Sequence, residues 1–140
     1  MKKISLLLGI LGMFSSSVYG AETENRINFS FDNKEIIVAL ENNSATENFL
    51  NQLPLELRFE DFNRTEKIST LPKELDTSNS PNSCIPKNGD LTYYSPWGNL
   101  AFFYKDFRHS NGLVPLGKIV SGRENLEDID KNYLVKIEKI

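Results

Sequence analysis

The sequence contains very little cysteine and histidine, two residue types from which catalytic and metal sites are often built. Its 140 residues include one cysteine, Cys84, and one histidine, His109. A single cysteine excludes an intrachain disulfide, and a nucleophilic cysteine requires a lowered pKa and a nearby base. Cys84 lies in a stretch rich in serine, asparagine and proline, where Lys87 is the only basic neighbour. We therefore interpret Cys84 as an incidental loop thiol, and we expect no cofactor.

The sequence also lacks an excess of basic residues. It has 16 lysines and arginines against 19 aspartates and glutamates, which gives a formal net charge of −3. Nucleic acids and anionic membrane surfaces are bound by basic patches. The acidic balance therefore argues against both as partners, and we interpret it as a solvated surface.

Long apolar runs are absent except at the N-terminus. There, Lys2 and Lys3 precede an apolar run over residues 4–14, which is followed by three serines and by Val-Tyr-Gly-Ala at 18–21. This layout is typical of a secretory signal peptide, and the run is shorter than the roughly 20 residues of a permanent membrane span. No cysteine follows the run to carry a lipid anchor. We predict a signal peptide over residues 1–20 and one exported domain over residues 21–140, periplasmic or secreted, with no stable membrane anchor after cleavage.

Alternation of apolar and polar residues predicts several short strands, because a half-buried strand has a side-chain period of two. The strands predicted by this pattern or by apolar composition cover residues 27–31, 35–40, 55–60, 68–71, 113–120 and 133–137. Asp-Asn-Lys at 32–34 is typical of a turn between the first two. Gly117 indicates a bulge or a close backbone approach in its strand.

Two short helices are predicted between these strands. Ser44 and Glu47 fit a capping box, and the first helix should run to about Gln52 because Pro54 prevents its continuation. The second is predicted over residues 124–129. Their positions, one early and one late, favour helices that cap the two ends of a barrel.

Residues 89–106 form the most aromatic stretch and predict a hairpin at the centre of the core. Ser-Pro-Trp-Gly at 95–98 is typical of a tight turn, and the apolar flanks predict strands that are buried on both faces. Residues 72–88, rich in serine, asparagine and proline, predict a long loop that is either mobile or functional. Together these patterns predict a mainly β fold: a closed β-barrel of about eight strands with two short capping helices.

Several strings resemble the cyclophilins. Residues 27–49 resemble their opening hairpin and first helix, and residues 116–122 resemble their Phe-Gly-x-Val-x-x-Gly string. The combination of residues 89–94, 96–104 and 112–119 is similar to a compact bacterial family of cyclophilin-like domains. The resemblance implies a cyclophilin-like barrel for most of the chain, and that family has no settled biochemical role.

The resemblance fails at the catalytic strings of the prolyl isomerases. Those enzymes use an arginine in Phe-His-Arg, a glutamine in Phe-x-x-Gln-Gly-Gly and an aromatic pocket for the substrate proline, and they stabilise the twisting amide by hydrogen bonds. Neither string occurs here. Arg58, between Leu57 and Phe59, is the only stand-in for the arginine. Phe103 matches the pocket phenylalanine, but Ala101 stands where that strand usually has glutamine.

Simpler interpretations stand beside these candidates. Arg58 lies between Glu56 and Glu60, as expected for a solvated strand face with little energetic significance. These two acids and Asp61 also invite a metal-site interpretation, but no histidine accompanies them, so we expect no metal. His109, beside Arg108, is expected to be an exposed side chain.

Trp97, at the tip of the predicted turn, has two interpretations that the sequence leaves open. Exposed beside Tyr94, it would suit a peptide-binding surface; folded back, it would cover one end of the barrel. The candidates for a ligand groove are Phe103, Tyr94, Trp97 and Arg58, and no residue is assigned a catalytic role.

These observations predict a binding module for a proline-containing peptide or a small ligand, with little or no isomerase activity. The alternative is a divergent peptidyl-prolyl cis-trans isomerase that uses Arg58 and Phe103 and assists folding outside the cytoplasm. Unrelated enzyme chemistry is not indicated, because no nucleophile, base and orienting group occur together.

Overall fold

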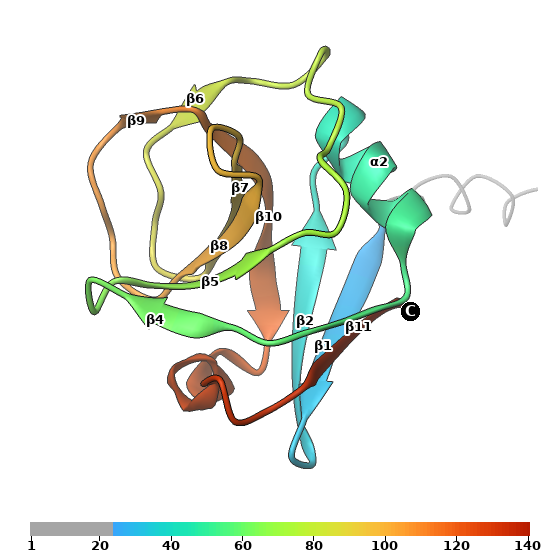
Figure 1. The fold of residues 1–140 in the computed structure, drawn as a ribbon, viewed down its shortest axis with the longest axis vertical. Helices are drawn as coiled ribbons and strands as arrows, with labels where there is room; N and C mark the ends of the chain where they lie inside the picture. Colours follow the sequence, from blue (N-terminus) through green and yellow to red (C-terminus); the bar gives the residue numbers. More distant parts are fainter. Residues whose placement is uncertain (1–23) are drawn as a thin grey trace, which may run out of the picture.

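The computed structural model describes residues 24–140 of the chain, so the predicted signal peptide lies outside the described residues. No helix among the described residues is long and apolar enough to cross a membrane. The described residues form a mainly β fold, shown in Figure 1, and contain eleven strands and two helices. The elements are β1 (Arg26–Phe31), β2 (Lys34–Leu40), α2 (Ser44–Gln52), β3 (Leu55–Leu57), β4 (Glu60–Phe62), β5 (Glu66–Thr70), β6 (Ser83–Cys84), β7 (Asp90–Tyr94), β8 (Asn99–Phe103), β9 (Ser110–Asn111), β10 (Leu113–Ser121), the 3₁₀ helix η1 (Arg123–Asp128) and β11 (Val135–Lys139).

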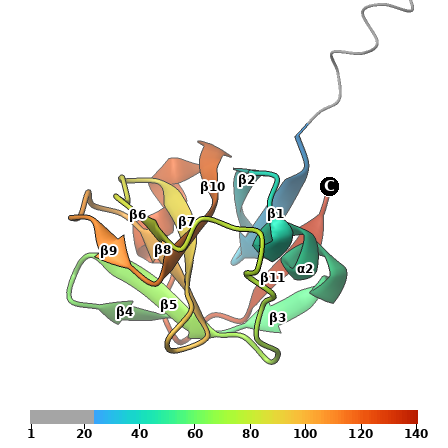
Figure 2. The same ribbon diagram turned by 90° about the horizontal axis from the view of Figure 1, so that it is seen from above.

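Nine of the strands form one strongly curled sheet, and the prediction of a closed barrel of about eight strands is wrong. The strand order is β3-β11-β1-β2-β10-β7-β8-β5-β4, and β6 pairs only with β9. The two edge strands, β3 and β4, are consecutive in sequence and are separated only by Arg58 and Phe59. Two successive pieces of one extended segment cannot pair with each other, so the hydrogen-bonded ladder stays open where this segment passes from one edge to the other. Figure 2 shows the two groups of strands facing each other across the interior.

The predicted opening hairpin is confirmed. Strand β1 pairs with β2, and alternate residues of both strands are buried in the main core. The turn between them places Asp32 and Asn33 at φ 47° and 61°, the left-handed region that two-residue hairpin turns require. Phe29 of β1 packs against Phe102 with ring centroids 5.0 Å apart and against Phe59 at 6.3 Å. The core therefore joins β1 to Phe59, in the segment between β3 and β4, and to Phe102 of the aromatic hairpin.

Helix α2 ends where predicted, but its capping box begins one residue earlier. Asn43 is the N-cap: its side chain accepts a hydrogen bond from the Thr46 amide at 2.9 Å, and the Asn43 amide donates to Thr46 Oγ1 at 3.0 Å. Ser44 is not available for this role, because its hydroxyl lies 2.9 Å from Ser80 Oγ and accepts from the Asn79 amide at 2.8 Å. The helix start is thus tied to the long loop.

The predicted aromatic hairpin is confirmed as β7 and β8. Gly98 has φ 70°, and its amide donates to the Tyr94 carbonyl at 2.9 Å to close the turn. All five residues of β8 are buried. Leu100 and Phe102 face the main core, whereas Ala101 and Phe103 belong to a second apolar cluster on the other face of the sheet.

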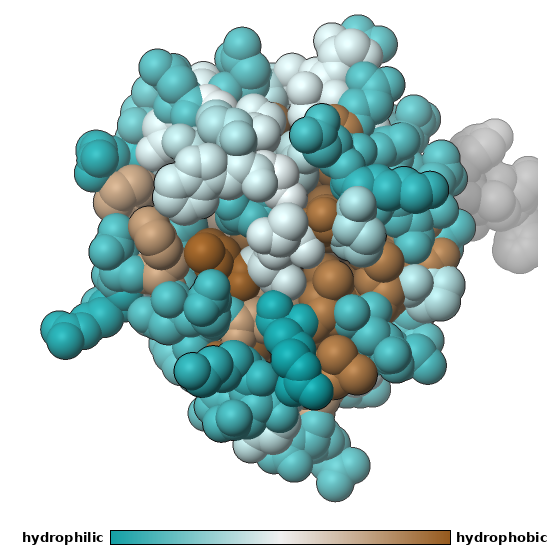
Figure 3. All heavy atoms as spheres, in the orientation of Figure 1, coloured by the Kyte–Doolittle hydropathy of each residue, from teal (hydrophilic) through white to brown (hydrophobic). Residues whose placement is uncertain are grey.

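The remaining elements differ in detail from the prediction. The strand predicted over residues 55–60 is divided into β3 and β4, and the long loop contains the short strand β6. The helix predicted over 124–129 is the 3₁₀ helix η1. Gly117 does mark a close approach: a Cβ there would overlap the Ala39 carbonyl, and the register of β10 shifts beside it. On the face drawn in Figure 3, hydrophilic side chains predominate and apolar ones show in patches near its middle.

Candidate functional site

A cleft of about 410 Å³ lies over the second apolar cluster. Its apolar lining includes Phe103 of β8, Ile68 of β5 and Leu113 of β10. Because side chains alternate between the two faces of a strand, the strands that fill the core with one set of residues present the other set to this cleft. A concave apolar surface with a few polar groups is the usual form of a ligand site.

Aromatic side chains form part of the cleft wall. Trp97 lies edge-on to Tyr94, with ring centroids 5.3 Å apart, and edge-on to Phe62 at 5.8 Å. Trp97 is 59% exposed, whereas Phe103 is 1% exposed. Trp97 is therefore exposed beside Tyr94 and does not fold back over one end of the barrel. Tyr94, Trp97 and Phe103, three of the four groove candidates, therefore lie along one cleft.

Arg58, the fourth candidate, does not line this cleft. Its side chain is exposed, and Nη1 donates to the Lys131 carbonyl at 3.1 Å, just before β11. The Arg58 carbonyl accepts a hydrogen bond from Ser69 Oγ at 2.7 Å. These contacts hold Arg58 at the junction between the two sheet edges, so it does not share a groove with Phe103.

The sequence did not indicate Glu66, which lies in the centre of a row of side chains across three strands. In the sheet register, Glu66 is opposite both Phe62 of β4 and Phe103 of β8. Burial, followed by the negative charge of Asp61, raises the pKa of the half-buried Glu66 carboxyl to about 7. Only the register of β5 could have placed Glu66 here, and the predicted strand began two residues too late, at residue 68.

The segment between β8 and β9 also contributes to the cleft. Phe107 stacks on Phe103 with ring centroids 6.1 Å apart, and the Arg108 guanidinium lies 4.5 Å from the centroid of the Phe107 ring. His109 is exposed, as expected, but it also lines the cleft. The sequence does not predict these residues as part of the site, because a polar, turn-prone segment carries no pattern that shows which face of the sheet it packs against.

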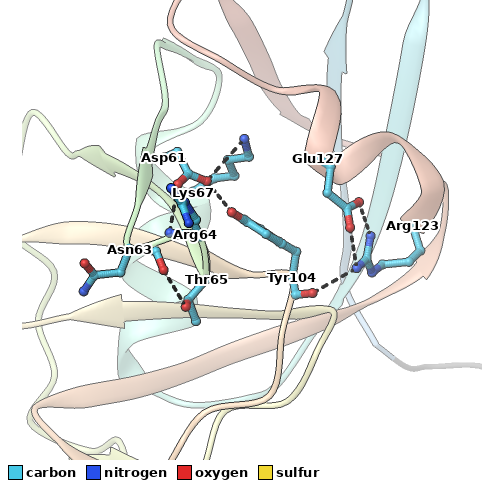
Figure 4. Close-up of polar contacts among 8 residues, drawn as sticks. All are labelled: Asp61, Asn63, Arg64, Thr65, Lys67, Tyr104, Arg123 and Glu127. Atoms are coloured by element: carbon cyan, nitrogen blue, oxygen red, sulfur yellow. Dashed lines mark hydrogen bonds and ion pairs between the residues drawn. The ribbon is translucent and has the colours of Figure 1, made fainter.

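A polar cluster beside the cleft joins β4, β5 and the end of β8 (Figure 4). Asp61 accepts hydrogen bonds from the Tyr104 hydroxyl and from the Arg64 amide, and lies 3.6 Å from Nζ of Lys67. Burial opposes ionisation of Asp61, but these three partners outweigh it and lower its pKa. The Lys67 side chain is only 8% exposed and lies 5.4 Å from the centroid of the Tyr104 ring. We interpret this cluster as structural, because Asp61 and Lys67 pair with each other and Asp61 also accepts the Tyr104 hydroxyl.

The Tyr104 end of the cluster is tied to η1. The pKa of the Tyr104 hydroxyl is raised to about 12 by burial and by its hydrogen bond to Asp61, so it remains a donor. Arg123 donates to the Tyr104 carbonyl at 3.2 Å and pairs with Glu127 at 2.7 Å. Figure 4 shows Arg123 between these two acceptors. The contacts fix the chain immediately after β8.

The other candidates for chemistry do not converge. Within residues 24–140, no group of three His, Cys, Asp or Glu side chains is placed to hold a metal ion. Cys84 packs against the second apolar cluster, and burial, with the charges of Asp90 and Glu41, raises its pKa to about 11. Its thiol is therefore protonated at neutral pH, which fits the interpretation of an unreactive side chain.

Comparison with known families gives a match over most of the chain. Residues 29–138 match the model of the cyclophilin-like family. A search of curated proteins found no match to the sequence. The chain therefore belongs to the cyclophilin-like family, and the match extends over all the strands that form the cleft.

Proposed function

We propose that this cyclophilin-like protein is a binding module that takes a peptide or a small ligand into the cleft beside Phe103, with little or no isomerase activity. The observation that carries the proposal is the cleft itself, in which a buried apolar floor adjoins an exposed tryptophan. Trp97 is held between two other aromatic rings. A tryptophan of this kind anchors a ligand at low cost in side-chain entropy.

The proposal includes export, for which the support is the pattern of residues 1–20: a basic start, a short apolar run and small residues at the cleavage position. The mature protein would then meet its ligand in the periplasm or outside the cell. A proline-containing peptide is one candidate ligand, because aromatic walls pack well against a proline ring.

A divergent peptidyl-prolyl isomerase is the second candidate function, supported by the position of Phe103 in the cleft. It requires a donor that stabilises the twisting amide. Arg58 is held by Lys131 and does not line the cleft, which favours binding without turnover. An isomerase assay on a proline peptide tests this preference: robust turnover that is lost in Arg58→Ala, but kept in the exposed control Arg64→Ala, would overturn it.

Binding itself can be measured through Trp97, the only tryptophan in the chain. Peptide libraries with and without proline are titrated against the protein, and the fluorescence of Trp97 is followed. We expect saturable fluorescence changes with the wild type, and an affinity about tenfold lower in Phe62→Ala, which removes one aromatic side chain from the cleft wall. The matched control is Tyr133→Ala, because Tyr133 is also a partly buried aromatic residue but packs on Phe31, away from the cleft. Absence of any saturable change at millimolar ligand, or equal binding by Phe62→Ala, would contradict the proposal.

A further inference from the structure

A carboxylate between two phenylalanines is an unusual component for the apolar floor of a cleft. Glu66 lies opposite Phe62 and Phe103 in the register, and all three residues line the cleft. Placing a carboxylate in such surroundings is unfavourable unless a counter-charge or hydrogen-bond donors compensate. An unusual polar group in a concave apolar site is therefore informative about what the site binds.

Within the described part of the chain, no side chain compensates Glu66. No hydrogen bond or ion pair to its carboxylate occurs among residues 24–140, although such contacts are formed by its neighbour Asp61. Lys67, the next residue, is engaged by Asp61. Arg108 lines the same cleft, but its guanidinium lies over the Phe107 ring and forms no ion pair with Glu66.

The aromatic walls suit a cation as well as an apolar group. The faces of tryptophan and phenylalanine attract ammonium groups placed over them. Trp97 packs edge-on against Phe62, the cross-strand neighbour of Glu66. A cation that enters the cleft beside these rings would meet the carboxylate and the aromatic rings together.

We propose, building on the binding function above, that the cleft recognises a peptide through a lysine side chain whose ammonium pairs with Glu66 beside Phe62 and Trp97. A lysine stem is apolar and its end is charged, which matches a cleft with an apolar floor and one uncompensated carboxylate. The volume of about 410 Å³ is larger than one such side chain, so residues that flank the lysine also find space. Charge complementarity therefore favours a basic peptide over a neutral one.

The test uses two short peptides with blocked ends that differ only in a central lysine or its neutral analogue norleucine. Each is titrated against the full mature chain at about pH 8, where Glu66 is ionised, with Trp97 fluorescence as the readout. Three proteins are compared: wild type, Glu66→Gln, and the control Glu56→Gln. The control removes the same charge from an exposed position on β3 that does not line the cleft.

We expect the wild type to bind the lysine peptide about tenfold more tightly than the norleucine peptide. The preference should disappear in Glu66→Gln, which no longer offers a charge to the lysine ammonium, and should persist in Glu56→Gln. Equal binding of both peptides by the wild type, or a preference that survives in Glu66→Gln, would overturn the lysine proposal while the binding function stands. If neither peptide binds at millimolar concentration, the lysine proposal fails, and the library titration described above decides separately whether the binding function stands.

Discussion

Replacing Glu66 by glutamine should stabilise the protein at alkaline pH and leave its stability almost unchanged in acid. The pKa of the Glu66 carboxyl is raised from 4.5 to about 7 in the folded protein. The folded state therefore binds the Glu66 proton more tightly than the unfolded state does. Between these two pKa values the stability of the wild type falls as the pH rises. Above pH 7 the free energy of unfolding of the wild type is lowered by the full cost of ionising a half-buried carboxyl. Glu66→Gln carries no such charge and avoids this loss.

The size of the effect follows from the pKa difference. The difference between a pKa of 4.5 and one of about 7 corresponds to about 3 kcal/mol. Glu66 is only half-buried, so solvent screening reduces the expected gain to about 1–2 kcal/mol. Near pH 4 the protonated carboxyl and the amide are both neutral and similar in shape, so the two proteins should unfold at nearly the same denaturant concentration.

Urea unfolding followed by Trp97 fluorescence measures this difference. Wild type, Glu66→Gln and Glu56→Gln are compared at about pH 4 and about pH 8, and the quantity of interest is the pH dependence of each mutational change. The comparison cancels the contributions of other titrating groups, because they are the same in all three proteins. A Glu66→Gln variant that gains nothing at the higher pH, or gains equally at both, would refute the assignment of an uncompensated carboxylate at this position.

Two further changes test how the sheet around the cleft is held. Gly117→Ala should lower the free energy of unfolding by at least about 2 kcal/mol, because the added Cβ overlaps the Ala39 carbonyl. A smaller loss in urea unfolding would show that β10 and β2 can move apart at little cost in free energy. Asp61→Asn should lower the free energy of unfolding at neutral pH, because the almost buried Lys67 ammonium loses its counter-charge. We expect a loss of only about 1–2 kcal/mol, since Asp61 itself is partly exposed. Since the pKa of Asp61 is lowered by folding, its contribution exists above its ordinary pKa and disappears as the pH falls through the folded value; a cost that persists in strong acid would contradict this account.

The features that the sequence predicts correctly are those that depend on residues close together in the sequence. The alternation in β1 and β2 and the turn at Asp32 and Asn33 are local, as is the turn between β7 and β8. The capping box was misplaced by one residue because the Ser44 hydroxyl is taken by Ser80, 36 positions away. No local pattern reports such a contact.

The same limit explains what was missed in the site. Tyr94, Trp97 and Phe103 were identified as groove candidates from one aromatic hairpin, within which the strand period fixes their faces. Glu66 belongs to the cleft only because β5 pairs with β8 in a particular register. Arg58 was placed on an exposed strand face, but the break between β3 and β4 and the Lys131 carbonyl decide where it points. Register and sheet edges are properties of the whole fold.

The turn that carries Trp97 is also fixed from outside the hairpin, which bears on how the cleft binds. The Ser95 amide donates to the Gly112 carbonyl, and the Gly112 amide donates to the Asn82 carbonyl, both at 2.8 Å. These bonds connect the turn to the start of β10 and to the chain before β6. An exposed tryptophan on a turn held in this way loses little conformational freedom when a ligand packs against it. The cleft is thus largely formed before binding, and its affinity should depend on the chemistry of its walls, above all on Glu66 and the rings beside it.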